Sequence, residues 1–287
     1  MNVANKIILG TVQFGLPYGI NNSTGEQVSS TEVEKLLSYS ASEGIYTLDT
    51  SSAYGNSEQV LGQVIGKCEN FKIISKFPQG QLAVKTVFAQ SLQRLKQEKL
   101  YGYLVHHFSF YKDNPSIWDD FVVLKASGKV EKIGFSLYSP HELEYILTQN
   151  IKFDLIQIPY NIFDRSFDPY FEILKNRQVE IHARSVFLQG LFFRDLEQLP
   201  LKLQPLRVYL TKIKEYCSAE NITIEELALN FNLHHPYIDG VLIGVDTLEQ
   251  LQENMKSIRT VPNLKADEFI KTINISEKNL LNPVNWK

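Results

Sequence analysis

Short β-rich apolar runs alternate along this chain with longer segments in which apolar residues recur every three or four positions. The helical segments include residues 31–42, 84–96, 140–148 and 248–257, and Ser30, Ser139 and Thr247 stand near three of the expected starts, where caps are favoured. Such alternation predicts βα units and a parallel sheet. The eight strand-like runs are KIILGTV from Lys6, IYTLDT from Ile45, KIISK from Lys72, YGYLVH from Tyr101, KIGFS from Lys132, DLIQIPY from Asp154, EIHARS from Glu180 and GVLIG from Gly240.

Eight strands separated by helices predict an α/β fold, a (β/α)8 TIM barrel. The 287 residues could form two domains by length alone, but α/β barrels reach this size as one unit. A doubly wound sheet would usually carry a glycine-rich dinucleotide turn after an early strand, and this sequence has none. No linker or low-complexity tract interrupts the pattern. We therefore expect residues 1–287 to form a single domain.

Two stretches break the regular spacing. Residues 14–30 form a turn-rich segment after the first strand, and residues 188–207 form a long connection after the seventh. In a TIM barrel the segments that follow the strands build the active site. Both stretches are therefore expected to be walls or lids of a substrate pocket.

The composition indicates a globular protein, with 44% hydrophobic residues, 21% charged residues and a net charge of −3. No basic block is present, which argues against nucleic-acid binding. Cys68 and Cys217 form neither a metal-binding spacing nor a disulfide framework, as expected in a reducing compartment. The sequence shows no targeting segment and no apolar run of about 18 residues. We expect a cytoplasmic protein that binds no membrane and, by default, a monomer.

Four residues with complementary chemistry stand at or just after predicted strand ends: Asp49, Tyr54, Lys76 and His106. A tyrosine has an unperturbed pKa of about 10, and a buried ammonium beside it favours the phenolate and lowers that pKa. Lys76 supplies the ammonium, and the carboxylate of Asp49 would keep it charged. His106 would orient a carbonyl group. Together they predict a general acid for reduction of an aldehyde or ketone, given a separate source of hydride.

Taken singly, each of these residues has an ordinary structural explanation. Asp49 is a possible turn or helix cap, and Tyr54 a packed aromatic. Lys76 is a possible solvated strand end, and His106 or His107 a core histidine. Three separate strand ends and one adjoining loop, all on the face where barrel enzymes react, make the functional interpretation the stronger one.

The same motifs resemble the aldo-keto reductase family over essentially the whole chain. The segment LDTSSAYGNSEQVLG resembles the family's Asp and Tyr motif, ISKF its lysine strand, and YLVHHF its histidine strand, with His106 in the catalytic place. The segments GKVEKIGFS, LIQIPYNIFDR, SVFLQGLF and VLIGVDTLEQLQEN resemble its cofactor-binding segments in the same order. The resemblance implies that NADPH or NADH binds across the C-terminal face and reduces a small-molecule carbonyl substrate.

The resemblance also implies a set of cofactor-binding residues. An ordinary structural explanation also exists for some of them. Gly190 and Gly244 are compatible with turn glycines, and Glu253 and Asn254 fit an exposed helix surface. The residues expected to contact the nicotinamide are Ser136 and Gln157; the pyrophosphate segment contains Ser185, Leu188 and Gly190; and the adenine end contains Gly244, Gln250, Glu253 and Asn254.

Three positions depart from the family pattern. Leu137 replaces a frequent asparagine, which removes one hydrogen bond to the nicotinamide. Arg184 replaces a stacking tyrosine, and a guanidinium there either stacks on the ring or reaches an anionic substrate or the cofactor phosphates. Asp246 lies where NADPH-preferring members commonly carry Arg or Lys, and a carboxylate repels the 2′-phosphate. We expect dual or NADH-leaning specificity.

The substrate is less well defined by the sequence. Tyr18, Phe108, Phe110, Tyr160 and Arg165 are candidates for the pocket wall, although packing or surface roles are equally compatible with these residues. The two arginines, Arg165 and Arg184, are compatible with a phosphorylated, carboxylated or nucleotide-linked sugar as the substrate. A second hypothesis is a regulatory or redox-sensing protein that binds the cofactor with little turnover.

A third hypothesis is a metal-dependent barrel hydrolase. Its ligands would come from Asp49, His106, His107 and His182. The sequence has no His-x-His after its first strand, which argues against this class, and we expect no metal site.

Overall fold

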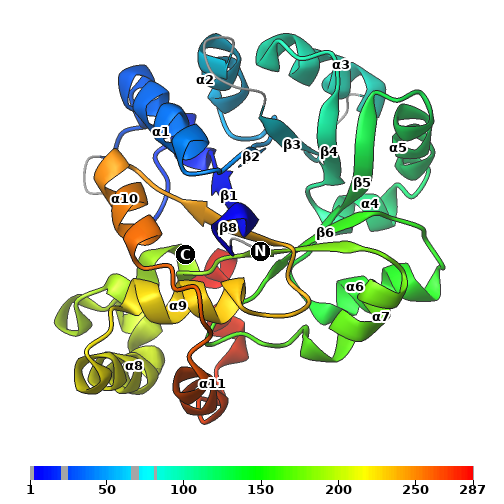
Figure 1. Cartoon of the computed structure of the whole chain (residues 1–287). Helices are drawn as coiled ribbons and strands as arrows, with labels where there is room; N and C mark the ends of the chain where they lie inside the picture. Colours follow the sequence, from blue (N-terminus) through cyan, green and yellow to red (C-terminus); the bar gives the residue numbers. More distant parts are fainter. Residues whose placement is uncertain (1–2, 21–24, 66–70, 81–82, 287) are drawn as a thin grey trace.

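The computed structural model describes residues 3–20, 25–65, 71–80 and 83–286. Eight parallel strands pair in chain order, and β8 pairs with β1, so the sheet closes into a barrel (Figure 1). The TIM barrel prediction is confirmed, and each of the eight predicted runs overlaps one strand, with β3, β4 and β5 extending one or two residues beyond their runs. The strands are β1 (Ile7–Gly10), β2 (Thr47–Asp49), β3 (Lys72–Phe77), β4 (Leu100–Val105), β5 (Val130–Ser136), β6 (Leu155–Pro159), β7 (Glu180–Arg184) and β8 (Gly240–Gly244).

Helices surround the strands and begin at caps that the sequence supplies. Thr247 accepts a hydrogen bond from the amide of Gln250, as expected of an N-cap. Ser29, and not Ser30, caps the first helix, because Ser30 is already helical. The helices are α1 (Ser30–Ser42), α2 (Ser57–Val64), α3 (Val84–Leu95), α4 (Phe108–Asp113), α5 (Ile117–Ala126), α6 (Pro140–Thr148), α7 (Phe171–Asn176), α8 (Arg207–Glu220), α9 (Ile224–Leu233), α10 (Leu248–Lys256) and α11 (Leu264–Lys271).

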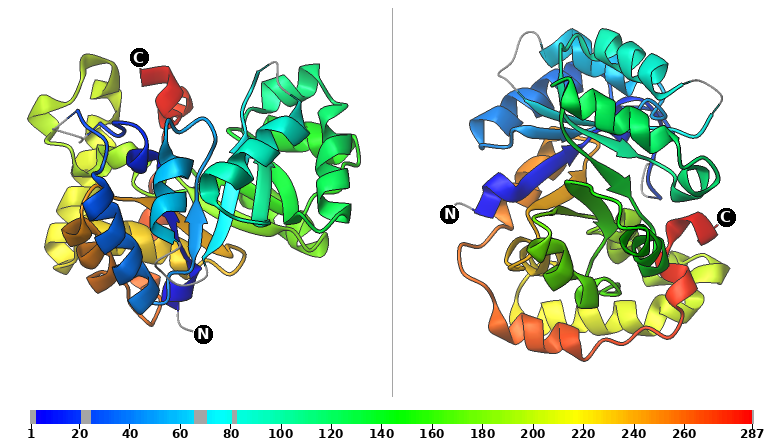
Figure 2. Two further views of the ribbon diagram at one scale, coloured as in Figure 1. Left: turned by 90° about the horizontal axis from the view of Figure 1, so that it is seen from above. Right: turned by 90° about the vertical axis from the view of Figure 1, so that its right-hand side faces the viewer.

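Short 3-10 turns shape the two ends of the barrel. The first, η1 (Val3–Lys6), lies at the end where the strands begin, and η9 (Pro283–Trp286) lies at the opposite end (Figure 2). The C-terminal residues therefore lie over the face on which the strands finish. The remaining turns are η2 (Val12–Phe14), η4 (Asp168–Tyr170), η5 (Leu188–Phe193), η6 (Leu196–Gln198), η7 (Leu201–Leu206) and η8 (Lys278–Leu281).

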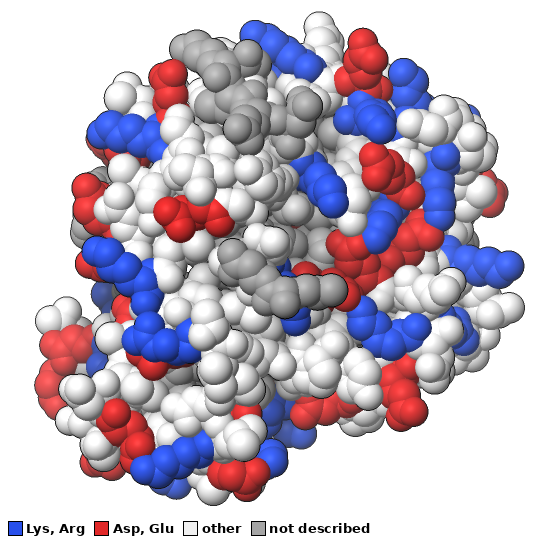
Figure 3. All heavy atoms as spheres, viewed as in Figure 1, with Lys and Arg blue, Asp and Glu red and all other residues white. Residues whose placement is uncertain are grey.

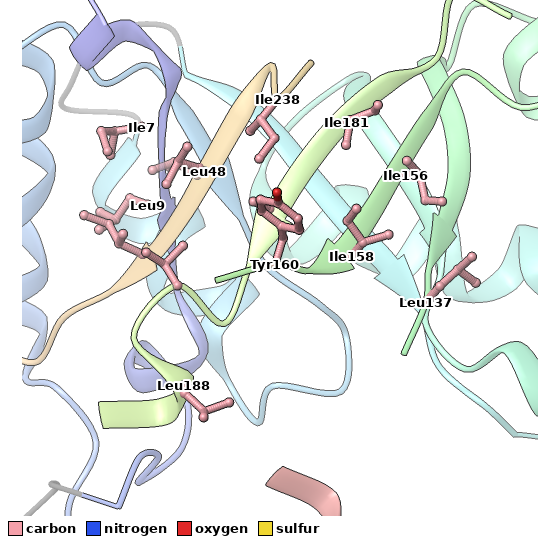
Figure 4. Packing of buried hydrophobic residues seen from close by; sticks show 14 of the residues in the cluster. Ile7, Leu9, Leu48, Leu137, Ile156, Ile158, Tyr160, Ile181, Leu188 and Ile238 are labelled. Atoms are coloured by element: carbon pink, nitrogen blue, oxygen red, sulfur yellow. The ribbon is translucent and has the colours of Figure 1, made fainter. Parts of the chain in front are cut away.

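The two-residue period of the strands divides their side chains between two environments. On β6, Ile156 and Ile158 pack in the large core (Figure 4). Gln157 between them takes part in neither core and donates a hydrogen bond to Asp49 of β2. A small second core of Ile74, Leu104 and Leu155 is separate from the large one. This alternation allows polar residues to line the barrel interior while the outer face of the sheet stays apolar.

The surface carries charges of both signs. Acidic and basic side chains are interspersed over the face shown in Figure 3. Among the described residues, no helix is long and apolar enough to cross a membrane.

Candidate active site

A buried ion pair lies at the C-terminal ends of β2 and β3. The Nζ atom of Lys76 lies 2.5 Å from an oxygen of Asp49 and 3.0 Å from the carbonyl oxygen of Thr50. The side chains of Lys76 and Asp49 are only 2% and 3% exposed. Gln157 on β6 donates from Nε2 to the second Asp49 oxygen at 2.5 Å. Both carboxylate oxygens are therefore occupied, and the ammonium is held in place.

Tyr54 lies beside this pair in the turn that follows β2. Its hydroxyl is 3.4 Å from the Nζ atom of Lys76. The next residue, Gly55, has a φ of +54°, and a Cβ atom there would lie 2.2 Å from the carbonyl oxygen of Gly15. Only glycine fits this contact between the two loops. The turn that carries Tyr54 is thus fixed by close packing against the first βα loop.

The electrostatics of Tyr54 differ from the sequence-based expectation. Burial, and then the charge of Asp49, raise the pKa of Tyr54, while Arg184 lowers it. Burial also lowers the pKa of Lys76, against the effect of Asp49. The prediction of a lowered Tyr54 pKa is therefore wrong for this structure, because burial, and then the charge of Asp49, raise that pKa. Tyr54 is a neutral phenol at ordinary pH and retains a proton to donate.

His106 follows β4 and completes the group. Its ring meets the Tyr54 ring edge-on, with centroids 5.6 Å apart. Burial, and then the charge of Lys76, hold the pKa of His106 well below 6.5, so the ring is neutral. The hydroxyl of Ser51 lies 3.1 Å from Nδ1 and accepts from the amide of Ala53, which favours donation of its own proton to Nδ1. The Nε2 atom then carries the ring proton.

These four residues line an elongated cavity of about 560 Å³, a size typical of small-molecule sites. Both irregular stretches contribute walls, and the hydroxyl of Tyr18 in the first accepts from Nε2 of Gln189 in the second at 2.5 Å. Expected cofactor residues on the cavity wall are Ser136, Gln157, Arg184, Ser185, Gly190, Gly244, Asp246, Gln250, Glu253 and Asn254.

Leu188 is the expected cofactor residue that does not line the cavity. Its side chain is fully buried and packs in the large core (Figure 4). The adjoining Gln189 and Gly190 reach the cavity instead. Leu188 and Gln189 both have positive φ, an uncommon conformation for residues other than glycine. Leu188 therefore anchors the loop, and the sequence motif alone did not separate this role from ligand contact.

Three buried acceptors on the cavity wall have no partner among the described residues. They are Oε1 of Gln157, Oε1 of Gln13 and Oδ1 of Asp246. The carboxamide and ribose hydroxyls of a nicotinamide cofactor supply hydrogen-bond donors, so the cavity fits such a cofactor. Gln13 was missed in the sequence, where a glutamine in the first βα loop carries no distinctive signal.

The end of the cavity near β8 is acidic. Asp246 is half-buried, burial raises its pKa, and its backbone amide donates to Oε1 of Gln250 at 2.8 Å. Glu225 and Glu253 line the same cavity. The described lysines and arginines of the wall are Lys76 and Arg184, from β3 and β7.

Arg184 lines the same cavity as Tyr54, Lys76 and His106. It donates to the carbonyl oxygen of Leu137 at 2.8 Å, and its guanidinium lies 4.2 Å from the centre of the Tyr138 ring. The side chain of Leu137 is fully buried in the large core. The leucine that replaces the family's asparagine therefore makes no polar contact in the cavity, as expected.

Several sequence candidates lie elsewhere. Phe108, Phe110 and Tyr160 are absent from the described wall of the cavity, and Tyr160 donates to Asp168 at 2.6 Å. The guanidinium of Arg165 donates to the carbonyl oxygens of Ile270 and Ile273, which ties the C-terminal segment to the barrel.

The four side chains that were considered as metal ligands do not come together in one cluster. His182 pairs with Glu180 at the opposite end of β7, away from Asp49 and His106. Within the described part of the chain, no three His, Cys, Asp or Glu residues form a metal-binding group.

The comparison with known families decides the assignment. The model of the aldo/keto reductase family matches residues 6–276. The chain belongs to the aldo/keto reductase family. This aldo/keto reductase is accordingly an NAD(P)H-dependent oxidoreductase that acts on small carbonyl compounds.

Individual relatives of this aldo/keto reductase are distant. The uncharacterized oxidoreductase YqkF of Bacillus subtilis is 23% identical over 75% of this chain and 78% of its own. L-galactose dehydrogenase of Arabidopsis thaliana is 24% identical over 78% and 77%. The holo form of the aldo-keto reductase AKR11C1 from Bacillus halodurans has a TM-score of 0.73 at 20% identity, covering 94% of this chain and 92% of its own. These likenesses support the shared fold.

Proposed function

We propose that this enzyme reduces a sugar or sugar-derived carbonyl to an alcohol, with Tyr54 as the proton donor. The observation that carries the proposal is the contact of the Tyr54 hydroxyl with Lys76 at 3.4 Å, beside the neutral ring of His106 and within one cavity. A relative named L-galactose dehydrogenase supports the choice of sugars.

Each side chain has a distinct task in this proposal. The bound nicotinamide supplies the hydride. Tyr54 gives its proton to the carbonyl oxygen as negative charge develops there, and the ammonium of Lys76 stabilises the phenolate that results. Asp49 keeps Lys76 charged in a buried site. His106 donates from Nε2 to the same carbonyl oxygen and so fixes its position.

The acidic end of the cavity supports NADH as the preferred cofactor. A carboxylate at Asp246 can accept a hydrogen bond from a free ribose hydroxyl, whereas it repels a 2′-phosphate. The described cations of the cavity wall, Lys76 and Arg184, lie at the catalytic end. A 2′-phosphate beside Asp246 would therefore have no positively charged side chain of this wall next to it.

Two measurements test this function in order. Fluorescence titration with NADH and NADPH measures cofactor binding, and oxidation of the bound cofactor is then followed with a panel of neutral aldehydes and sugars. Carbonyl-dependent turnover supports the reductase. Tight binding without turnover would favour the regulatory alternative, and absence of binding would contradict both.

Cofactor preference is tested by Asp246→Ala, with Glu249→Ala as a matched control at an exposed position of α10. We expect Asp246→Ala to tighten NADPH binding by several-fold, on the order of 1 kcal/mol, and the control to leave it unchanged. Tighter binding of NADPH than NADH by the wild type, unaltered in Asp246→Ala, would contradict the preference. Light scattering tests the expectation of a monomer.

A further inference from the structure

A second cavity of about 690 Å³ adjoins the catalytic end of the first. The two cavities share Tyr138, Arg184 and Ser185. The rest of the second cavity is formed by the loops after β5 and β6 and by the C-terminal residues around η8. A substrate whose carbonyl lies beside Tyr54 can therefore extend past Arg184 into this space.

Arg184 brings a positive charge to the junction that no acidic side chain offsets among the described residues. Its hydrogen bonds go to neutral acceptors, the carbonyl oxygen of Leu137 at 2.8 Å and the hydroxyl of Ser185 at 3.4 Å. Its Nε atom is buried and has no partner in the described part of the chain. Lys76, in contrast, is neutralised by Asp49. Of the two described cations on the wall of the first cavity, Arg184 is thus the one without an acidic partner.

The acidic residues of the second cavity are already engaged. Asp168 accepts from the hydroxyl of Tyr160 at 2.6 Å, and Asp164 accepts from the amide of Ser166 at 3.1 Å. Lys278 of η8 lines the same cavity as a further positive charge. The cavity wall therefore carries three cations, Arg184, Lys278 and Arg165, of which Arg165 is held by backbone carbonyl oxygens of the C-terminal segment. Each of its two carboxylates already accepts a hydrogen bond from the protein.

We propose that the second cavity binds a carboxylate or phosphate group of the carbonyl substrate, and that Arg184 recognises this group. The proposal rests on the function proposed above and defines its substrate class. A planar guanidinium forms paired, charge-assisted hydrogen bonds with either anion, and these bonds are stronger in a partly buried site than in water. The stacking of Arg184 on Tyr138 holds the guanidinium ready for such contacts.

The test compares matched neutral and anionic substrates. Benzaldehyde is compared with 4-carboxybenzaldehyde, and glyceraldehyde with glyceraldehyde 3-phosphate, for the wild type, Arg184→Gln and Lys278→Gln. Arg207→Gln is the control, because Arg207 pairs with Glu197 outside both cavities. We expect Arg184→Gln to reduce the anionic-to-neutral ratio of kcat/KM by roughly 10- to 100-fold, mainly through KM. Lys278→Gln should reduce it by several-fold.

The two substrate pairs distinguish the two anions. The pair with the larger anionic-to-neutral ratio of kcat/KM in the wild type shows whether carboxylate or phosphate is the preferred group. Equal kcat/KM for neutral and anionic partners in the wild type would overturn the inference while leaving the reductase intact. Equal losses for both partners in Arg184→Gln, together with at least tenfold weaker NADH binding, would assign Arg184 to the cofactor and also overturn it.

Calorimetric binding of 4-carboxybenzaldehyde and of glyceraldehyde 3-phosphate to the wild type gives a readout independent of turnover. If no carbonyl compound is reduced, the proposed function fails, yet binding that Arg184→Gln weakens at least tenfold still supports the anion site. Absence of binding in both arms overturns the anion site.

Discussion

The barrel interior contains two polar clusters assembled from the same four kinds of side chain, one at each end of the strands. The proposed catalytic cluster, called the catalytic cluster below, contains Asp49, Lys76, Tyr54 and His106. The opposite cluster contains Glu180, Lys132, Tyr101 and His182. On β3 and β4, the small apolar core positions Ile74 and Leu104 lie between the two clusters.

The difference lies in where the hydrogen bonds go. Glu180 accepts from the Tyr101 hydroxyl at 2.7 Å, from Lys132, and from His182 at 2.6 Å, so all three other members of its cluster bind the carboxylate. In the catalytic cluster the carboxylate is occupied by Lys76 and Gln157. The tyrosine and the remaining histidine nitrogen there are left facing a cavity.

Under the proposed function, the same composition therefore serves structure at one end and chemistry at the other. The Glu180 cluster is absent from the described walls of both cavities, and it joins β4, β5 and β7 by direct contacts. The catalytic cluster directs a phenol and a neutral imidazole toward the space that receives the ligand. Substitutions at equivalent members of the two clusters should accordingly separate stability from activity.

Removal of the two lysines should have unequal effects on stability. Lys76→Met is expected to lower the free energy of unfolding by about 3–5 kcal/mol, because the Asp49 carboxylate stays buried without its counter-charge. Lys132→Met should cost about 1 kcal/mol or less, since its side chain is 32% exposed and Glu180 keeps two other partners. Urea denaturation measures both changes. Equal losses would contradict the distinction between the clusters.

Acid unfolding should report on Glu180. Although burial opposes it, hydrogen bonds from His182, Lys132 and Tyr101 lower the pKa of Glu180 to about 2. This folded-state pKa lies below the unfolded value, so the stabilisation is complete above about pH 5 and is lost as the pH falls toward 2. Glu180→Gln should remove roughly 3 kcal/mol of that pH-dependent stability.

Denaturation of wild type and Glu180→Gln across this pH range measures the effect. Glu131→Gln, at an exposed residue paired with Lys99, is the control and should keep the wild-type slope. The same slope in Glu180→Gln would show that Glu180 contributes no acid-sensitive stability.

The two tyrosines should separate activity from structure. Tyr54→Phe removes the proposed proton donor, and turnover should fall by about 100-fold or more while NADH binding persists. Tyr101→Phe removes one hydrogen bond to Glu180 and should leave turnover close to that of the wild type. Steady-state kinetics with a neutral aldehyde measures both. Near-normal turnover in Tyr54→Phe would refute its assignment as the general acid.

The smallest expected effect concerns the pH profile. Because burial and Lys76 hold the pKa of His106 well below 6.5, the ring stays neutral between about pH 6 and 8 and contributes no inflection there. The pH dependence of kcat should therefore be flat over this range for the wild type. An inflection near pH 6.5 that His106→Gln abolishes would show that the charge of His106 changes over this pH range during turnover.

Much of the architecture could be predicted because strand and helix periods are local properties of the chain. Each of the eight strands overlaps a predicted run, and Thr247 caps its helix as expected. The meeting of Asp49 and Lys76 also followed from their places at adjacent strand ends. The two irregular loops were expected to form walls, and Tyr18 and Gln189 show them in contact over the cavity.

Other features depended on contacts between distant residues. Leu188 was assigned to the cofactor by its motif, yet packing directs its side chain into the core. Arg165 was expected to line the substrate pocket, and it lies on the wall of the second cavity, where backbone carbonyls of the C-terminal segment hold its guanidinium. Gln13 is set apart by a buried side-chain oxygen on the cavity wall that has no partner among the described residues, and this follows from its neighbours in the fold.

By itself the sequence determined the barrel, the family resemblance and the placement of the catalytic cluster, because hydrophobic period and strand order fix which residues reach the same face. The tertiary structure decided which of these side chains carry a charge and which charges are paired. It placed Asp49 against Lys76, buried Tyr54 so that its pKa is raised and it stays a neutral phenol, and directed Arg184 to a backbone carbonyl oxygen and not to an acidic side chain. Burial and pairing set pKa values and net charge, and both depend on three-dimensional neighbours that no linear spacing specifies.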